Sequence, residues 1–229
     1  SAERFAEALW VVDGDPLRML GIPFTTRMVV VRLASGALWL HSPVAFTPQR
    51  RDAVAALGPL AHIVAPNKLH HLFVREWCAA FPEATSWADP GLAGRQPELG
   101  FARTLGDAAE PEWQADLDQV YFAASRVLPE MVFFHRPSRT AIFTDIIQNH
   151  DPTRDSRIMR WGKRMNRVLA PDGESPRDWR LTVRDRPAAR AAVERMLAWD
   201  IERVVLSHGL CVEQRGHAFV EHAFAWLAD

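Results

Sequence analysis

Short apolar segments alternate with amphipathic ones along this chain, and this alternation constrains the fold more than any other feature. Residues 25–44 and 130–147 have the pattern of strand hairpins. Residues 48–58, 70–82 and 187–200 have helical patterns, and the first and last of these carry a proline at their first position. Strands that alternate with helices, together with two hairpins, predict an α/β fold with mixed sheets.

The composition narrows the class of protein. The 229 residues are long enough for one sizeable α/β domain or two small ones, and we expect one domain over residues 1–229. Lys and Arg number 27 against 28 Asp and Glu, so the total charge gives no reason to expect nucleic acid or an acidic membrane as partner. Six of the nine tryptophans fall in predicted regular elements and are expected to be buried: Trp10, Trp39, Trp77, Trp87, Trp161 and Trp199.

Several features bear on the cellular location. Cys78 and Cys211 form neither a disulfide framework nor a CxxC pair, which fits a reducing compartment. The first residues carry acids and no apolar run of the kind found in signal peptides. No stretch approaches the ~18 apolar residues of a membrane span. We therefore expect a cytoplasmic protein that acts on a small molecule.

Three apolar segments end in a side chain that can bind a metal. "AIFTD" ends at Asp145, "RVVLSHG" contains His208, and "HIVAPNKLHH" ends at His70 and His71. Ligands usually bind at the carboxyl ends of strands in an α/β sheet. Taken alone, the histidine pair is more typical of a helix cap and a polar niche. Asp145 and His208 have similar alternatives, as a cap and as a turn residue, and only the three segments together favour a metal site.

Four phrases carry a resemblance to a known family: "RMVVVRLASGALWLHSPV", "HIVAPNKLHHLF", "FFHRPSRTAIFTD" and "AWDIERVVLSHG". Over roughly residues 8–209 the chain resembles the metallo-β-lactamase superfamily, which consists mostly of metal-dependent hydrolases. More narrowly, it resembles a branch of bacterial and plant proteins that share a domain of unknown function. The resemblance implies a four-layer αββα sandwich with mixed sheets.

The superfamily's Thr-His-x-His-x-Asp-His motif is altered in this chain, where "APNKLHH" takes its place. Pro66 and Lys68 stand where the first two histidines would be, and His70 replaces the aspartate. Only His71 is retained. A further histidine expected near residues 126–130 is absent. The resemblance therefore implies that the first of the family's two metal sites is lost, since proline cannot bind a metal.

The second metal site keeps a complete ligand set in altered form. By resemblance its ligands are His70, His71, Asp145 and His208. Three imidazoles and one carboxylate suit zinc best, while Fe²⁺ or Mn²⁺ remain compatible. We expect at most one divalent metal in the chain.

A single metal site of this kind implies a hydrolase in which an activated water attacks an ester, a phosphoester or a lactone. Asp145 would also accept a proton from that water. Lys68 would stabilise developing negative charge, or pair with Asp145. The alternative is a non-catalytic descendant that binds a small anion or a protein partner. An oxygen-handling role with iron is disfavoured, because in this superfamily it usually needs two metals.

Two further histidines lie close to the predicted ligands in the sequence. His41 stands where the superfamily often has an aspartate that supports the metal motif. We favour a structural role for His41 and regard support of the metal ligands as the next possibility. His135 precedes Asp145 by ten residues across the same hairpin. It is expected either to lie on the surface or to orient a metal ligand.

Basic residues suggest how an anionic substrate could be bound. Arg136 and Arg139, in "HRPSRT", are candidate contacts for such a substrate. The segment 154–167 places several arginines and a lysine on one helix face. This face is more often solvated than a substrate platform. Nucleic acid is not expected there, because no ladder of aromatic residues is interleaved with the charges.

Overall fold

The structure is a computed structural model, and it describes residues 1–19 and 22–228. The chain forms two compact units, Ser1–Leu117 and Asp118–Asp229, and each is described by itself. The expectation of one domain over residues 1–229 stays a prediction. Among the described residues, no helix has the length and apolar character needed to cross a membrane.

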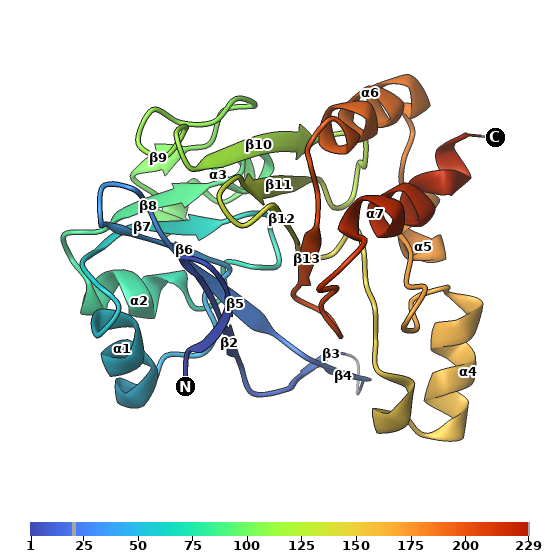
Figure 1. The fold of residues 1–229 in the computed structure, drawn as a ribbon, viewed down its shortest axis with the longest axis horizontal. Helices are drawn as coiled ribbons and strands as arrows, with labels where there is room; N and C mark the ends of the chain where they lie inside the picture. The colour runs from blue at the N-terminus through green and yellow to red at the C-terminus, as the bar shows by residue number, and fades with distance from the viewer. Residues whose placement is uncertain (20–21, 229) are drawn as a thin grey trace. The chain divides into compact units, whose positions relative to one another are not determined.

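The N-terminal unit is built on a mixed sheet of seven strands in the order β1-β2-β5-β6-β7-β8-β9 (Figure 1). Neighbouring strands from β1 to β6 are antiparallel, and those from β6 to β9 are parallel. The predicted hairpin at residues 25–44 is confirmed as β5 and β6. The strands are β1 (Glu3–Ala6), β2 (Leu9–Asp13), β5 (Arg27–Arg32), β6 (Leu38–His41), β7 (Leu60–Ala65), β8 (Thr85–Ala88) and β9 (Arg103–Thr104), with β3 (Leu17–Met19) and β4 (Ile22–Phe24) as a separate pair.

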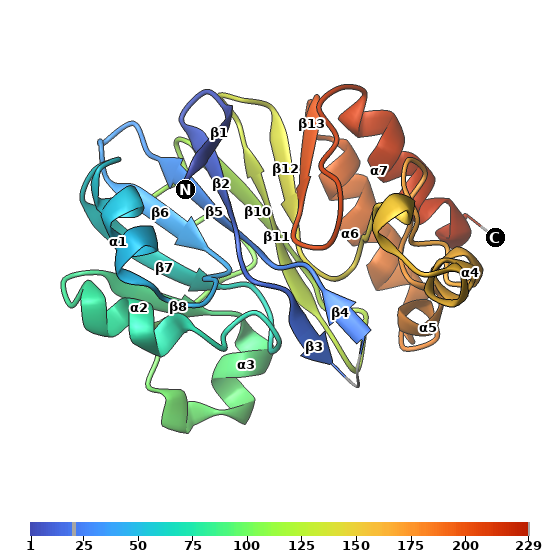
Figure 2. The ribbon, with the colours of Figure 1, turned by 90° about the horizontal axis from the view of Figure 1, so that it is seen from below.

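Three helices, α1 (Pro48–Ala55), α2 (Val74–Ala80) and α3 (Pro90–Arg95), pack on this sheet, and the 3-10 turn η1 (Pro97–Leu99) follows them. Figure 2 shows α1 and α2 along one side of β6, β7 and β8. Val54, Trp77 and Leu92 place one buried side chain from each helix in a common core with the sheet. The helix expected over residues 70–82 begins only at Val74, because a turn occupies residues 70–73.

The C-terminal unit contains a four-stranded sheet in the order β10-β11-β12-β13. The predicted hairpin at residues 130–147 is confirmed as antiparallel β11 and β12, and β13 then pairs with β12 in parallel. Antiparallel and parallel pairs in the same sheet make it mixed, as predicted. The strands are β10 (Leu117–Phe122), β11 (Glu130–His135), β12 (Thr140–Phe143) and β13 (Arg203–Leu206).

Helices cover one face of this second sheet. Trp179, Met196 and Phe224, from α5, α6 and α7 in turn, join the buried core that the strands contribute to. Helix α6 begins at Arg186, one residue before the predicted start at Pro187, and Asp185 caps it by accepting the N–H of Ala188 at 2.9 Å. The helices are α4 (Arg157–Met165), α5 (Arg177–Arg180), α6 (Arg186–Leu197) and α7 (Gly216–Phe224), with 3-10 turns η2 (Pro152–Arg154) and η3 (Ala225–Leu227).

Candidate metal centre

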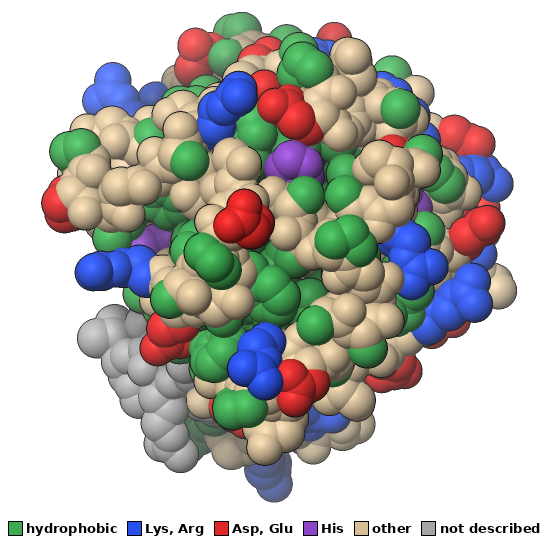
Figure 3. Space-filling model, turned by 90° about the vertical axis from the view of Figure 1, so that its left-hand side faces the viewer, with side chains coloured by type: hydrophobic (Ala, Val, Ile, Leu, Met, Phe, Trp, Pro, Cys, Tyr) green, Lys and Arg blue, Asp and Glu red, His purple; other side chains and the backbone are tan. Residues whose placement is uncertain are grey.

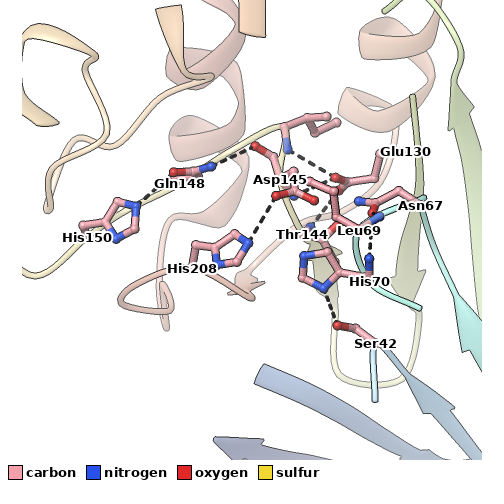
Figure 4. A network of polar contacts seen from close by, with 11 residues as sticks. Ser42, Asn67, Leu69, His70, Glu130, Thr144, Asp145, Gln148, His150 and His208 are labelled. Carbon is pink, nitrogen blue, oxygen red and sulfur yellow. Dashed lines mark hydrogen bonds and ion pairs between the residues drawn. The ribbon is translucent and has the colours of Figure 1, made fainter. Parts of the chain in front are cut away.

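Parallel pairing in the C-terminal unit brings two of the predicted ligands together. Phe143 of β12 lies opposite Leu206 of β13, so residues at equal steps beyond the two strands are neighbours. Asp145 and His208 are such a pair: Oδ1 of Asp145 lies 3.2 Å from Nε2 of His208, and both side chains are buried (Figure 4). The ends of β12 and β13 therefore bring the carboxylate of Asp145 next to the imidazole of His208, as predicted.

Glu130 fixes the backbone that carries Asp145. Its carboxylate is fully buried at the start of β11. One oxygen accepts the N–H of Thr144 at 2.7 Å, and the other accepts the N–H of Asp145 at 2.6 Å and that of Ile146 at 3.2 Å (Figure 4). Burial, and then the charge of Asp145, raise the pKa of Glu130, while the backbone hydrogen bonds act in the opposite direction. The sequence patterns did not single out this residue.

Hydrogen bonds to its backbone fix the position of His208. Asn149 donates its N–H to the carbonyl of His208 at 3.1 Å, and Leu210 donates to the carbonyl of Asn149 at 2.8 Å. Gly209 makes this close approach possible. Its φ is +104°, and a Cβ at this position would lie 2.1 Å from the carbonyl oxygen of Asn149. The glycine that follows His208 is therefore a structural requirement of the site.

A buried histidine next to this pair stays neutral. His150 Nε2 lies 2.9 Å from Oε1 of Gln148, whose amide nitrogen contacts the carbonyl of Asp145 at 3.5 Å (Figure 4). Burial lowers the pKa of His150 to about 3, and the positive charges of Lys163 and His208 act in the same direction. No sequence pattern marked His150 as part of this network.

In the N-terminal unit, a buried asparagine shapes the turn that carries His70. Oδ1 of Asn67 accepts the N–H groups of Leu69 at 2.8 Å and of His70 at 3.0 Å. Nδ1 of His70 shares a hydrogen bond of 2.5 Å with the hydroxyl of Ser42, just beyond β6 (Figure 4). A metal bound by His70 would therefore use Nε2. Histidine ligands commonly have the other ring nitrogen fixed in this way.

His71 has different neighbours from His70. It lines a cavity of about 210 Å³ together with Arg75 and Cys78 of α2 and with residues 99–101. Its Nδ1 is buried and forms no hydrogen bond within the described part of the chain. Burial lowers the pKa of His71, a hydrogen bond with the backbone of Lys68 acts in the opposite direction, and the nearby His70 lowers the pKa further. The prediction that both histidines bind one ion stays a prediction.

His41 is completely buried at the end of β6 and stacks on Trp39, with ring centroids 5.4 Å apart. Burial, and then the charge of His70, lower the pKa of His41 well below its ordinary value. The hydrogen bond to His70, however, comes from the neighbouring Ser42. Lys68 is half-buried and forms no ion pair with any residue in 1–19 or 22–228. Its role with a substrate or with Asp145 stays a prediction.

His135, Arg136 and Arg139 lie at the end of the second sheet opposite to Asp145. His135 pairs with Thr140, the first residue of β12, whereas Asp145 follows the last. About five residues of extended chain, roughly 16 Å, separate the two ends. His135 contacts Ser138 at 2.7 Å and is buried, so it neither lies on the surface nor orients Asp145 or His208.

The two arginines of this hairpin are engaged elsewhere. Arg136 forms an ion pair with Asp118 at 3.1 Å, and Arg139 forms one with Asp200 at 2.5 Å. Both follow β11 on the side of the sheet edge that carries His135. The prediction that Arg136 and Arg139 contact an anionic substrate stays a prediction. Ion pairs with nearby acids account for their positions.

The spacing of the Asp145–His208 pair can be compared with two chemical situations. A separation of 3.2 Å lies at the long end of the range for a hydrogen bond between an imidazole and a carboxylate. Ligand atoms bound at roughly 2.0–2.1 Å to one tetrahedral Zn²⁺ lie about 3.3–3.4 Å apart. The donor types and their separation therefore fit two ligands of one zinc ion.

Comparisons with known proteins give independent information. The model of the family described as Domain of unknown function (DUF4336) matches residues 7–160. No curated protein sequence matches the chain.

Solved structures, by contrast, match it over its full length. A metallo-β-lactamase from Pontibacter korlensis has a TM-score of 0.67 at 11% identity, with 100% of this chain and 99% of that chain covered. The metallo-β-lactamase FIM-1 from Pseudomonas aeruginosa, in its mono-zinc form, has a TM-score of 0.66 at 11% identity, covering 100% and 94%. The metal-soaked Flv1 flavodiiron core from Synechocystis sp. PCC6803 has a TM-score of 0.65 at 13% identity, covering 100% and 60%.

At these identities the likeness concerns the fold, and it confirms the predicted α/β fold of the metallo-β-lactamase type with mixed sheets. The family match covers most of the sequence, including the segments that carry His70 and Asp145. The chain belongs to the family described as Domain of unknown function (DUF4336), and its fold is that of the metallo-β-lactamase superfamily.

Proposed function

We propose that the chain is a metal-dependent hydrolase that binds one divalent metal ion, most favourably zinc. Asp145 and His208 are its ligands from the C-terminal unit, and His70 is its ligand from the N-terminal unit. The observation that carries the proposal is the buried carboxylate–imidazole pair at 3.2 Å. Two proteins of similar fold bear on the same point, since the FIM-1 structure is a mono-zinc form and the Flv1 structure is a metal-soaked flavodiiron core.

The choice of His70 rests on its own surroundings and on its place in the family motif. Its Nδ1 is occupied by Ser42, which orients the ring and directs Nε2 to a metal. His71 is left out of the proposed set, because it lines the cavity beside Arg75 and Cys78. This departs from the four ligands expected from the sequence and makes the two neighbouring histidines distinguishable by experiment.

A divalent metal at this position supplies a nucleophilic water at neutral pH and polarises the group to be cleaved. Residues of the protein position the ligands, accept the proton and stabilise the developing charge. Glu130 holds the N–H groups of Thr144 and Asp145, so the Asp145 carboxylate is fixed before substrate binds. Asp145 accepts a proton from the attacking water. Lys68 stabilises negative charge that develops on the substrate oxygen. Esters, phosphoesters and lactones are the substrate classes proposed.

Measurement of the metal content of the purified full chain tests the metal site. We expect about one metal per chain in the wild type and much less in Asp145→Ala, His208→Ala and His70→Ala. His71→Ala should keep its metal. His217→Ala is the matched control, because His217 is an exposed histidine that contacts the carbonyl of Leu197.

Two outcomes of the metal measurement contradict the proposal. One is a wild type without metal whose circular dichroism and melting temperature are unchanged in the ligand variants, which is the behaviour of a relic site. The other is loss of metal in His71→Ala with retention in His70→Ala. If metal is bound, hydrolysis of p-nitrophenyl acetate, bis-p-nitrophenyl phosphate and a γ-lactone, each with and without chelator, tests the hydrolase itself.

A further inference from the structure

Helix α4 presents an apolar stripe to solvent. Ile158, Trp161 and Met165 are 83%, 66% and 51% exposed, and none of the nine residues of the helix is buried. Their spacing of three and four residues places them on one face. In Figure 1, α4 lies away from α6 and α7, which cover the sheet of its unit. The expected burial of Trp161 is therefore wrong, and this hydrophobic face requires an explanation.

The same helix is strongly basic. It contains Arg157, Arg160, Lys163 and Arg164 and no acidic residue. Of these four, within residues 1–19 and 22–228, only Lys163 forms an ion pair, with Asp155 at 2.8 Å. On the face that Figure 3 shows, basic and acidic side chains are instead interspersed among hydrophobic ones. The charge of α4 is thus a local feature that the near-neutral total conceals.

The helix is formed and fixed without a partner. Ser156 caps its N-terminus by accepting the N–H of Met159 at 3.3 Å. At its other end, the side chain of Asn166 both donates to and accepts from Asp178, at 3.1 and 3.2 Å. Together with the Lys163–Asp155 pair, these contacts hold the helix at three points. A binding partner would therefore not need to induce the helix.

We infer that α4 docks on an anionic lipid surface. Tryptophan and aliphatic side chains favour the membrane interface, and arginines beside them can reach lipid phosphates while their aliphatic stems lie in the apolar layer. A second copy of this chain fits less well, because a symmetric α4–α4 contact would bring the arginines of both copies together. The helix is only about 14 Å long, so we expect weak and reversible binding.

This inference concerns a different part of the unit from the metal site and does not depend on the proposed function. It also revises the expectation of no membrane partner, which rested on the total charge. The docked state would place the protein at a membrane through contact of α4 with the lipid surface.

Co-sedimentation of the full chain with vesicles tests the inference. We expect binding to phosphatidylcholine vesicles that contain 30% phosphatidylglycerol, and little binding to pure phosphatidylcholine. Binding should weaken at high salt because the attraction is screened. Trp161→Ser should reduce it several-fold, and Arg157→Glu with Arg164→Glu should reduce it by more than ~10-fold.

Matched controls distinguish specific vesicle binding by α4 from nonspecific binding by exposed apolar or basic residues elsewhere. Leu181→Ser removes an apolar side chain that is 77% exposed outside α4, and Arg95→Glu with Arg126→Glu makes the same change in net charge elsewhere. Both controls should bind vesicles like the wild type. If the two double charge-reversal variants lost vesicle binding equally, the inference would be overturned.

Three other results would overturn it as well. The first is no sedimentation of the wild type with anionic vesicles. The second is a wild-type dimer that Trp161→Ser converts to a monomer, which assigns the face to a second copy. The third is binding to polyglutamate without binding to vesicles, which assigns it to an acidic protein. Circular dichroism of each variant checks that the helix is retained.

Discussion

His150 makes the stability of this protein depend on pH in a way that can be calculated. Its pKa is lowered to about 3 in the folded chain, whereas an unfolded histidine titrates near ~6.5. The unfolded state therefore binds the proton more readily, and stability falls as pH drops below ~6.5. Between pH 7 and pH 5 this single group should cost about 2 kcal/mol of the free energy of unfolding.

Urea unfolding of wild type and His150→Gln at pH 5, 6 and 7, with chelator present, measures this effect. The variant should lose stability less steeply than the wild type, by about 2 kcal/mol over the two pH units. His217→Gln is the control, because His217 is exposed and its removal should leave the slope unchanged. Parallel pH profiles for wild type and His150→Gln would show that His150 is not held neutral by burial, and the reasoning would be refuted.

Three further substitutions test individual contacts. Glu130→Gln replaces one of the two carboxylate oxygens that accept backbone N–H groups by an NH2 donor, and chemical denaturation should show a loss of about 2–4 kcal/mol. An unchanged midpoint would contradict the hydrogen-bond assignment. Ser42→Ala should weaken zinc affinity roughly 10–100-fold in a competitive chelator titration, because Ser42 no longer orients the ring of His70. The melting temperature should stay constant. A zinc affinity equal to that of the wild type would show that Ser42 does not support the site. Gly209→Ala should lower the free energy of unfolding by more than ~2 kcal/mol, since its Cβ would collide with the carbonyl of Asn149, and a wild-type value would show that the two backbones can separate.

The sequence sufficed for the part of the site that follows from strand pairing. Asp145 and His208 each stand two residues beyond an apolar strand. Once β12 and β13 pair in parallel, equal offsets become neighbours, so the strand-end pattern together with the family resemblance predicted that carboxylate and imidazole meet. The same regularity accounts for the predicted hairpins and capped helices, because their signals are local.

What the sequence could not predict depends on contacts between distant residues. Glu130 follows "LP" at the start of an apolar strand, and nothing local indicates that its partners are backbone groups 14–16 residues away. The different surroundings of His70 and His71 depend on the side chain of Asn67, which closes the turn before α2. The position of His135 in the same hairpin as Asp145 suggested a place near the site, yet the hairpin register puts it at the opposite strand end.

X-ray absorption at the zinc edge of the zinc-loaded chain tests the central claim most directly, because it counts imidazole ligands around the ion. We expect scattering from two imidazoles per zinc in the wild type, from one in His70→Ala, and again from two in His71→Ala. An imidazole count that is unchanged in His70→Ala, or a sulfur ligand from Cys78 or Cys211, would contradict the account.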